Sequence, residues 1–361
     1  MYTDNGLMPI HHTIVEVAEE PKVIEAILHD KYDQVVKTAE KIADRRCENV
    51  FILGNGDSWF CGQMVEMAFE QYAGLPTFVP QGYEFYLYGH PCYTEKTAAV
   101  IMSSSGRVSK ARDTLEAVYA SKALKIGITD NNIPENPFIQ KTDIQIIPEA
   151  KKKGWPAQTT LASAVMMTAL AIETGRLRGH LSESEYKSLR EELNLVPGKI
   201  STALENSKKT SKSIARALES CSMYSFIGSG PGMAIANLGV ALMNEAPQIA
   251  AVSYQIEEYH HSLRFSILSM NHIPVLVALK GKAYQRFVET AESITNWGVP
   301  FAAIVNEGDE EIRKLATWCF EVPCVPEPMN ALTALPPLHQ WSIDLTDNRL
   351  LHGYLRTSIV P

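Results

Sequence analysis

One pattern occurs twice in this 361-residue chain. Residues 51–56 read Phe-Ile-Leu-Gly-Asn-Gly, and residues 225–230, which begin 174 positions later, read Ser-Phe-Ile-Gly-Ser-Gly. The apolar run at residues 100–102 has a counterpart at residues 275–277, so the offset stays almost constant between separate points of the chain. Self-similarity at a constant offset is typical of a duplicated structural unit. The sequence therefore predicts two copies of one domain.

The first copy alternates short apolar runs with helix-forming stretches. Such alternation predicts a parallel sheet with right-handed crossovers and helices on both faces. Each copy is expected to be an α/β domain with a five-stranded parallel sheet, a three-layer sandwich of flavodoxin-like type. In the first copy the strands are expected at residues 49–53, 77–80, 98–102, 124–129 and 143–147.

The repeats and the segments between them predict the domain boundaries. Amphipathic periodicity over residues 13–45 predicts helices that pack on a domain or on a partner subunit. The expected order is an N-terminal helical segment at 1–45, the first repeat at 46–180, a helical connection at 181–215, the second repeat at 216–345 and a C-terminal tail at 346–361.

Composition excludes several classes of function. The formal net charge of −8 argues against nucleic acid or an anionic membrane as the main partner. The six cysteines show no zinc-type pairing, and the N-terminus lacks the basic and apolar regions of a signal peptide. We therefore expect a cytoplasmic protein with reduced thiols and no membrane span.

The third strand ends abruptly in hydroxyl groups. Residues 99–102 are apolar, and Ser103, Ser104, Ser105 and Gly106 follow them. Backbone N–H groups and hydroxyls at such a strand-to-helix turn can hold a phosphate or sulfonate, although one serine could simply cap the next helix. The second copy has Ala-Leu-Lys-Gly at 278–281, so we expect the anion site in the first repeat alone.

Two other turns of the first repeat are expected at the same edge of the sheet. Gly56, Asp57 and Ser58 follow the first strand, and ligands of parallel sheets bind beyond the carboxyl ends of the strands. Gln158 and Thr159 start a helix after the fifth strand, where they could face the ligand or only begin the helix.

The second copy carries residues suited to proton transfer. Glu245 ends an apolar helix, and Glu258 and His261 lie in the acidic stretch that begins twelve residues later. A carboxylate can move a proton between adjacent carbons, and an imidazole can protonate a sugar ring oxygen near neutral pH. Partial burial would raise the pKa of Glu245, and neighbouring acids would favour protonated His261. An ordinary helix end and surface histidines are the alternatives, and no third ligand spacing supports a metal site.

These residues resemble the motifs of the sugar isomerase (SIS) domain family in its tandem form, from about residue 30 onward. The resemblance is to the isomerase domain of the glucosamine-6-phosphate synthases and to the fructosamine-phosphate deglycases. It implies that Glu245 is the catalytic glutamate, His261 the ring-opening histidine and Glu258 the acid before it. The Ser-x-Ser-Gly and Gly-Thr-Ser phosphate turns are matched by residues 103–106 and 56–58. The resemblance also implies a homodimer or higher homo-oligomer, since a neighbouring subunit can contribute the histidine.

Some positions depart from the family pattern. Arg107 stands where an acidic residue is common, so it could change the anion that is recognised or simply face solvent. No lysine follows Lys314 and no cysteine stands at position 2, which disfavours amine transfer from glutamine. The expectation is an aldose–ketose isomerase of a phosphorylated or sulfonated sugar that uses no cofactor or metal. The alternatives are a fructosamine- or glucosamine-6-phosphate deglycase or deaminase, and a non-catalytic sugar-phosphate-binding regulator.

Overall fold

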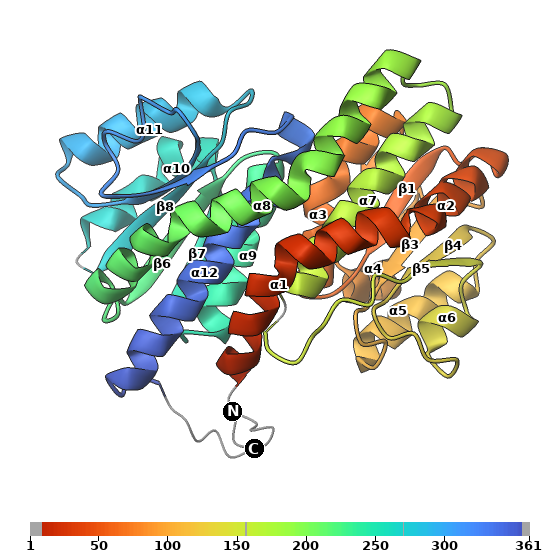
Figure 1. Cartoon of the computed structure of the whole chain (residues 1–361), viewed down its shortest axis with the longest axis horizontal. Coiled ribbons are helices and arrows are strands. Elements are labelled where there is room, and N and C mark those ends of the chain that lie inside the picture. Colours follow the sequence, from red (N-terminus) through yellow and green to blue (C-terminus); the bar gives the residue numbers. More distant parts are fainter. Residues whose placement is uncertain (1–8, 156, 270, 356–361) are drawn as a thin grey trace. The chain divides into compact units, whose positions relative to one another are not determined.

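The computed structural model describes residues 9–355 except residues 156 and 270 (Figure 1). The chain divides into two compact units, each with one sheet. The first unit contains residues Glu20–Lys152 and Gln158–Pro197, and the second unit contains the remaining described residues. Residues 1–8 and 356–361, which include the ends of the predicted N-terminal segment and tail, lie outside the described residues.

The first unit has a five-stranded parallel sheet in the order β2-β1-β3-β4-β5. Each strand is followed by a crossover, which confirms the predicted parallel α/β arrangement. The central strand is apolar and fully buried, as expected for a strand covered on both faces. The strands are β1 (Asn49–Leu53), β2 (Thr77–Phe78), β3 (Thr97–Met102), β4 (Leu124–Ile128) and β5 (Ile144–Ile146).

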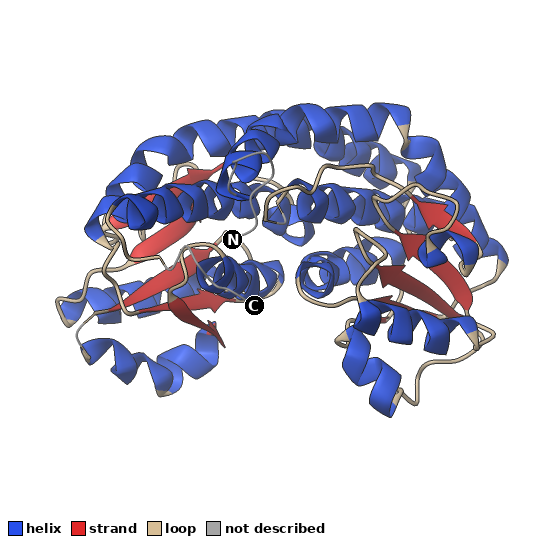
Figure 2. Ribbon diagram, turned by 90° about the horizontal axis from the view of Figure 1, so that it is seen from below, coloured by secondary structure: helices blue, strands red, loops and turns tan. Residues whose placement is uncertain are grey.

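Helices cover both faces of this sheet (Figure 2). Almost every side chain of α7 is buried, because that helix is apolar around its whole circumference. The helices assigned wholly to this unit are α2 (Tyr32–Asp44), α3 (Asp57–Ala68), the π-turn Phe69–Ala73, α4 (Gly82–Tyr88), α5 (Ser109–Tyr119), α6 (Pro137–Gln140) and α7 (Gln158–Leu177).

Two long helices contribute residues to both units. They are α1 (Pro9–Asp30) and α8 (Glu183–Ala217), which lie where the sequence predicts helices, with α2 completing the first of these segments. The boundary within α8 falls at Pro197, whose ring removes one backbone N–H from the helix.

The second unit repeats the topology of the first. Its parallel sheet has the order β10-β9-β8-β6-β7, which matches the first sheet strand for strand when it is read from the other end. This confirms the duplication predicted from the sequence. The strands are β6 (Met223–Gly228), β7 (Ala250–Gln255), β8 (His272–Ala278), β9 (Ala302–Asn306) and β10 (Trp318–Val322).

Trp341 organises the core of the second unit. Its ring packs against Tyr224 and Phe320 with centroid distances of 5.2 and 5.9 Å. The helix that carries it extends to Leu351, past residue 346, where the sequence placed the start of the tail. The helices are α9 (Pro231–Glu245), α10 (Ile256–His261), α11 (Tyr284–Asn296) and α12 (Asn330–Leu351), with 3-10 turns Leu263–Leu268 and Glu327–Met329. No described helix has the length and apolar character that a membrane crossing requires.

Candidate functional site

The three serines after β3 form a tight turn that is held by its own hydrogen bonds. Ser103 is buried, its N–H donates to the carbonyl of Ile128 at 3.0 Å, and its hydroxyl accepts from the N–H of Gly106 at 3.2 Å. Gly106 has φ of +64°, which disfavours a side chain there. A Cβ on Gly106 would also lie 2.2 Å from Oδ1 of Asn136, so this position requires glycine.

Residues after β4 support the turn from behind. The carbonyl of Ser104 accepts from the N–H of Asp130 at 3.0 Å and from the hydroxyl of Thr129 at 3.1 Å. The carbonyl of Ser105 accepts from the side-chain amide of Asn131 at 3.0 Å. The turn is therefore anchored through its carbonyls, and the side chains of Ser104 and Ser105 are only half-buried.

The serines do not cap the following helix. Helix α5 begins at Ser109, its N-cap is Val108, and no side chain caps it. Ser105 instead accepts from the N–H of Arg107 at 3.3 Å, and the Arg107 side chain is exposed. The capping alternative raised by the sequence is thus not what the structure shows, while the hydroxyl-lined turn is present.

Asp130 is a residue of this region that the sequence analysis missed. Burial raises the pKa of its carboxyl to about 6, and hydrogen bonds from the Ser104 hydroxyl and the Ala150 N–H oppose the shift. Its place two residues after the end of β4 was a usable signal, because polar residues at the carboxyl ends of parallel strands gather at one edge. A carboxyl group that titrates near pH 6 beside this turn would couple the affinity of any anion bound there to pH.

The turn after β1 lies at the same edge of the sheet as the serine turn. Strands β1 and β3 are paired neighbours, with Leu53 opposite Ile101. Gly56 has φ of +56° and is the N-cap of α3, which places Asp57 and Ser58 in the first helical turn.

Close packing at this turn excludes a side chain one position after the strand. A Cβ on Gly54 would lie 2.7 Å from Cβ of Ser58, so glycine is required for the helix start to approach the strand. Both Asp57 and Ser58 are half-buried.

Gln158 and Thr159 are buried at the start of α7. The side-chain oxygen of Gln158 accepts from the N–H of Lys151 at 2.8 Å, which ties the preceding loop to the helix. This contact assigns Gln158 a role in holding the loop, and a direct contact with a ligand stays a prediction for both residues.

In the second unit the structure distinguishes the two histidines of α10. The Nδ1 atom of His260 forms a 2.9 Å hydrogen bond with Oγ1 of Thr290 on α11, and burial lowers the pKa of His260. His261 is exposed. His260 is therefore the histidine that packs into the domain, whereas a ligand can reach the side chain of His261.

The acids of this region are also distinguished. Glu257 forms a bidentate pair with Arg286, at 2.6 and 3.0 Å, and this guanidinium lowers the pKa of Glu257. Glu258 is exposed, as is Glu245 at the end of α9. The expectation that Glu245 is partly buried in this chain is wrong, because the carboxylate lies at the polar end of the helix, beyond its buried apolar face. Glu257 is one of the neighbouring acids that were expected to favour the protonated form of His261. In the structure its carboxylate is paired with Arg286.

The second unit fills its corresponding turn with a carboxylate of its own. Oε1 of Glu327 accepts from the N–H of Lys282 at 3.0 Å, and a Cβ on Gly281 would lie 2.2 Å from that oxygen. The side chains of Asn306 and Asn330 bind the N–H and carbonyl of Lys280 at 2.7 and 2.9 Å. The repeat of the serine turn thus has no serines and already contacts an internal anion.

Comparison with protein families matches residues 43–172 to the SIS domain. The first unit of the chain therefore contains a match to the SIS domain. The match covers the first sheet, the serine turn and most of α7. The second unit has the same strand order, so its fold corresponds to that of the matched domain and is consistent with two SIS domains in tandem.

Known proteins share this tandem arrangement. A glutamine–fructose-6-phosphate aminotransferase (isomerizing) of Thermus thermophilus is 27% identical over 91% of the chain and 54% of its own length. The chain thus spans about half the length of the curated relatives that it matches. The C-terminal domain of a glucosamine-fructose-6-phosphate aminotransferase from Francisella tularensis superposes with a TM-score of 0.80 at 16% identity, covering 96% of this chain and 98% of that one. Tagatose-6-phosphate ketose/aldose isomerase from Escherichia coli superposes with a TM-score of 0.75 at 13% identity, covering 97% and 96%.

Proposed function

We propose that this chain is an aldose–ketose isomerase of a phosphorylated sugar and that its first SIS domain binds the phosphate. The observation that carries the proposal is the contrast between the two equivalent turns. One presents hydroxyl groups of Ser104 and Ser105 on a turn held from behind, and the other is occupied by Glu327. A phosphate dianion accepts charge-assisted hydrogen bonds from such hydroxyls and from the N–H groups of the turn.

The proton chemistry is assigned to the second SIS domain. His261 protonates the ring oxygen while the anomeric hydroxyl loses its proton, which opens the ring to the carbonyl form. Glu245 then removes the proton from C2, an enediolate forms, and the same carboxyl returns the proton to C1. Glu258 lies on the same short helix as His261 and is assigned as a second catalytic carboxyl group. The accessibility of Glu245 and His261 supports these roles, since a group that exchanges protons with a substrate has to reach it.

A deglycase or deaminase of an amino-sugar phosphate is the second candidate. Two of the relatives named above are aminotransferases, one of them described as isomerizing, and the third is a ketose/aldose isomerase, so similar proteins include amine chemistry beside isomerisation. The first steps would be the same, and an amine would then leave. Arg107, exposed beside the serine turn, supports recognition of a second acidic group or of a sulfonate in either case.

A substrate panel followed by NMR in deuterated water tests the proposal. Aldose and ketose 6-phosphates, a sulfonated sugar and fructosamine 6-phosphates are each incubated with the protein. An isomerase incorporates deuterium at C2 and interconverts aldose and ketose without releasing an amine. Amine release from the fructosamine phosphates alone would favour the second candidate, and ligand binding without any exchange would favour a regulator.

A further inference from the structure

A basic cavity lies at the edge of the first sheet opposite the serine turn. It has a volume of about 740 Å³, within the range of small-molecule sites. Five cationic side chains line it, together with two carboxylates. The cations are Lys41, Arg45, Lys96, Lys122 and Lys125, and the carboxylates are Glu95 and Asp143.

The strand direction shows that this cavity is separate from the serine turn. Lys96 comes directly before β3, whereas Ser103 comes directly after it. A six-residue strand is about 20 Å long, so the two places are too far apart for one sugar phosphate to contact both.

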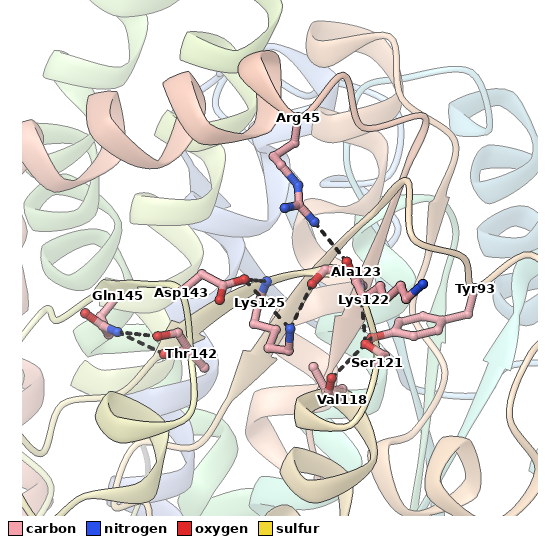
Figure 3. A network of polar contacts seen from close by, with 10 residues as sticks. All are labelled: Arg45, Tyr93, Val118, Ser121, Lys122, Ala123, Lys125, Thr142, Asp143 and Gln145. Atoms are coloured by element: carbon pink, nitrogen blue, oxygen red, sulfur yellow. Dashed lines mark hydrogen bonds and ion pairs between the residues drawn. The ribbon is translucent and has the colours of Figure 1, made fainter.

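Hydrogen bonds hold the loop before β4 in place (Figure 3). The Ser121 hydroxyl donates to the carbonyl of Val118 at 2.7 Å and lies 3.0 Å from the Tyr93 hydroxyl. A guanidinium nitrogen of Arg45 donates to the carbonyl of Lys122 at 2.9 Å, which joins α2 to this loop. Hydrogen bonds therefore hold the backbone that carries the charged side chains on both sides of the cavity.

The carboxylates offset only part of this positive charge. The ammonium of Lys125 donates to the carbonyl of Ala123 at 3.2 Å and forms an ion pair with Asp143 at 4.0 Å. Lys96 is paired with Glu48. Within the part of the chain that the structure describes, the ammonium groups of Lys41 and Lys122 have no ion pair, and both side chains are exposed.

We propose that this cavity binds a compact small molecule with a diphosphate group. Cationic side chains from two elements, α2 and the loop before β4, line the cavity. Two separate groups of positive charge suit two adjacent phosphates better than one. Lysine provides point charges, and the part of the Arg45 fork that is not used by Lys122 can bind phosphate oxygens. A nucleic acid fits less well, because the chain as a whole carries a net charge of −8 and the cationic surface is a cavity with acids in its wall.

Calorimetric titration of the full chain with inorganic pyrophosphate at 150 mM salt tests this site. The test variant is Lys41→Ala with Lys122→Ala, two exposed lysines of the cavity. The control is Lys37→Ala with Lys187→Ala, which removes the same charge from exposed lysines of the same unit that do not line the cavity. We expect saturable 1:1 binding that weakens at least tenfold in the test variant and less than twofold in the control. Isomerisation measured without pyrophosphate should be the same in all three proteins.

Other outcomes would overturn the proposal. Absence of saturable binding would do so, and equal weakening in both variants would show diffuse charge attraction. Binding that persists in the test variant and disappears in Ser104→Ala with Ser105→Ala would place pyrophosphate at the serine turn. A single-stranded oligonucleotide that binds and that pyrophosphate cannot displace would point to nucleic acid.

Discussion

Glu327 accepts a 3.0 Å hydrogen bond from the backbone N–H of Lys282, at the turn of the second unit that corresponds to the serine turn of the first. One repeat thus satisfies its strand-to-helix turn with an internal carboxylate, and the other presents hydroxyl groups there. The equivalent turns of the two copies therefore differ in the groups that they offer to a ligand.

Removal of the internal carboxylate should destabilise the second unit. Glu327→Ala removes the acceptor of the Lys282 N–H, a surface hydrogen bond whose net loss costs about 0.5–1.5 kcal/mol. Urea unfolding measures the change, with the exposed Glu310→Ala as the control. Affinity for the sugar phosphate should not change, because the phosphate is assigned to the first SIS domain. A large loss of affinity without a loss of stability would contradict the assignment.

The serine hydroxyls should contribute directly to phosphate affinity. Ser104→Ala with Ser105→Ala should weaken substrate binding by about 1–3 kcal/mol for each charge-assisted hydrogen bond lost. Titration calorimetry with the substrate from the panel measures this, and Ser109→Ala at the start of α5 is the matched control. Unchanged affinity in the double variant would remove the central claim of the proposed function.

Replacement of Glu245 and replacement of His261 should impair the reaction at different steps. Glu245→Gln keeps the shape of the side chain and should still bind substrate, yet lose isomerisation and deuterium exchange at C2 by roughly 10²–10⁴-fold. His261→Ala should be slow with the cyclic sugar and recover in part with an open-chain analogue. His260→Ala is a contrasting variant, since that ring packs on Thr290 and its loss should act on stability. Exchange at the wild-type rate in Glu245→Gln would move the base to another acid, with Glu258 the next to replace.

Asp130 should make the first SIS domain sensitive to pH. Its pKa is about 6 in the folded protein and about 4 in an unfolded chain, so the folded state binds the proton more tightly. The contribution of this group to stability is therefore fully favourable below about pH 4, decreases as pH rises to about 6 and is constant above that. Asp130→Asn should flatten this part of the stability profile, whereas the exposed Asp347→Asn should not.

The same carboxyl should also affect phosphate affinity. Ionised Asp130 repels an anion at the neighbouring serine turn, so wild-type affinity should fall relative to Asp130→Asn as pH rises through about 6. The substrate phosphate itself titrates near pH 6, so the informative quantity is the difference between the two proteins at each pH. A constant difference from pH 5 to 8 would show that Asp130 does not act on the anion.

The protein should associate into a dimer or larger homo-oligomer. The amphipathic helices α1 and α2 and the family resemblance motivate this expectation. Light scattering at micromolar concentration measures the mass, and a monomer alone would count against it. Full activity of a chain truncated before Lys41 would count against a role for these helices.

The sequence by itself determined the duplicated parallel sheet and the location of the hydroxyl-rich turn. Both depend on local pattern: apolar runs of strand length end at glycine or serine, and the pattern recurs at a constant offset. Neighbouring strands β1 and β3 were enough to bring residues 56–58 and 103–106 to one edge of the sheet. The serine turn was predictable because all its members lie within four consecutive residues.

Only the tertiary structure decided which polar groups are engaged and which are available. Glu327 is 45 residues from the N–H that it accepts from, and His260 is 30 residues from Thr290, so no local pattern could reveal either contact. The exposure of Glu245 and the burial of Asp130 were missed for the same reason. The environment of a titratable group depends on packing between elements that are distant in the chain, and the order of residues specifies that packing only through the whole fold.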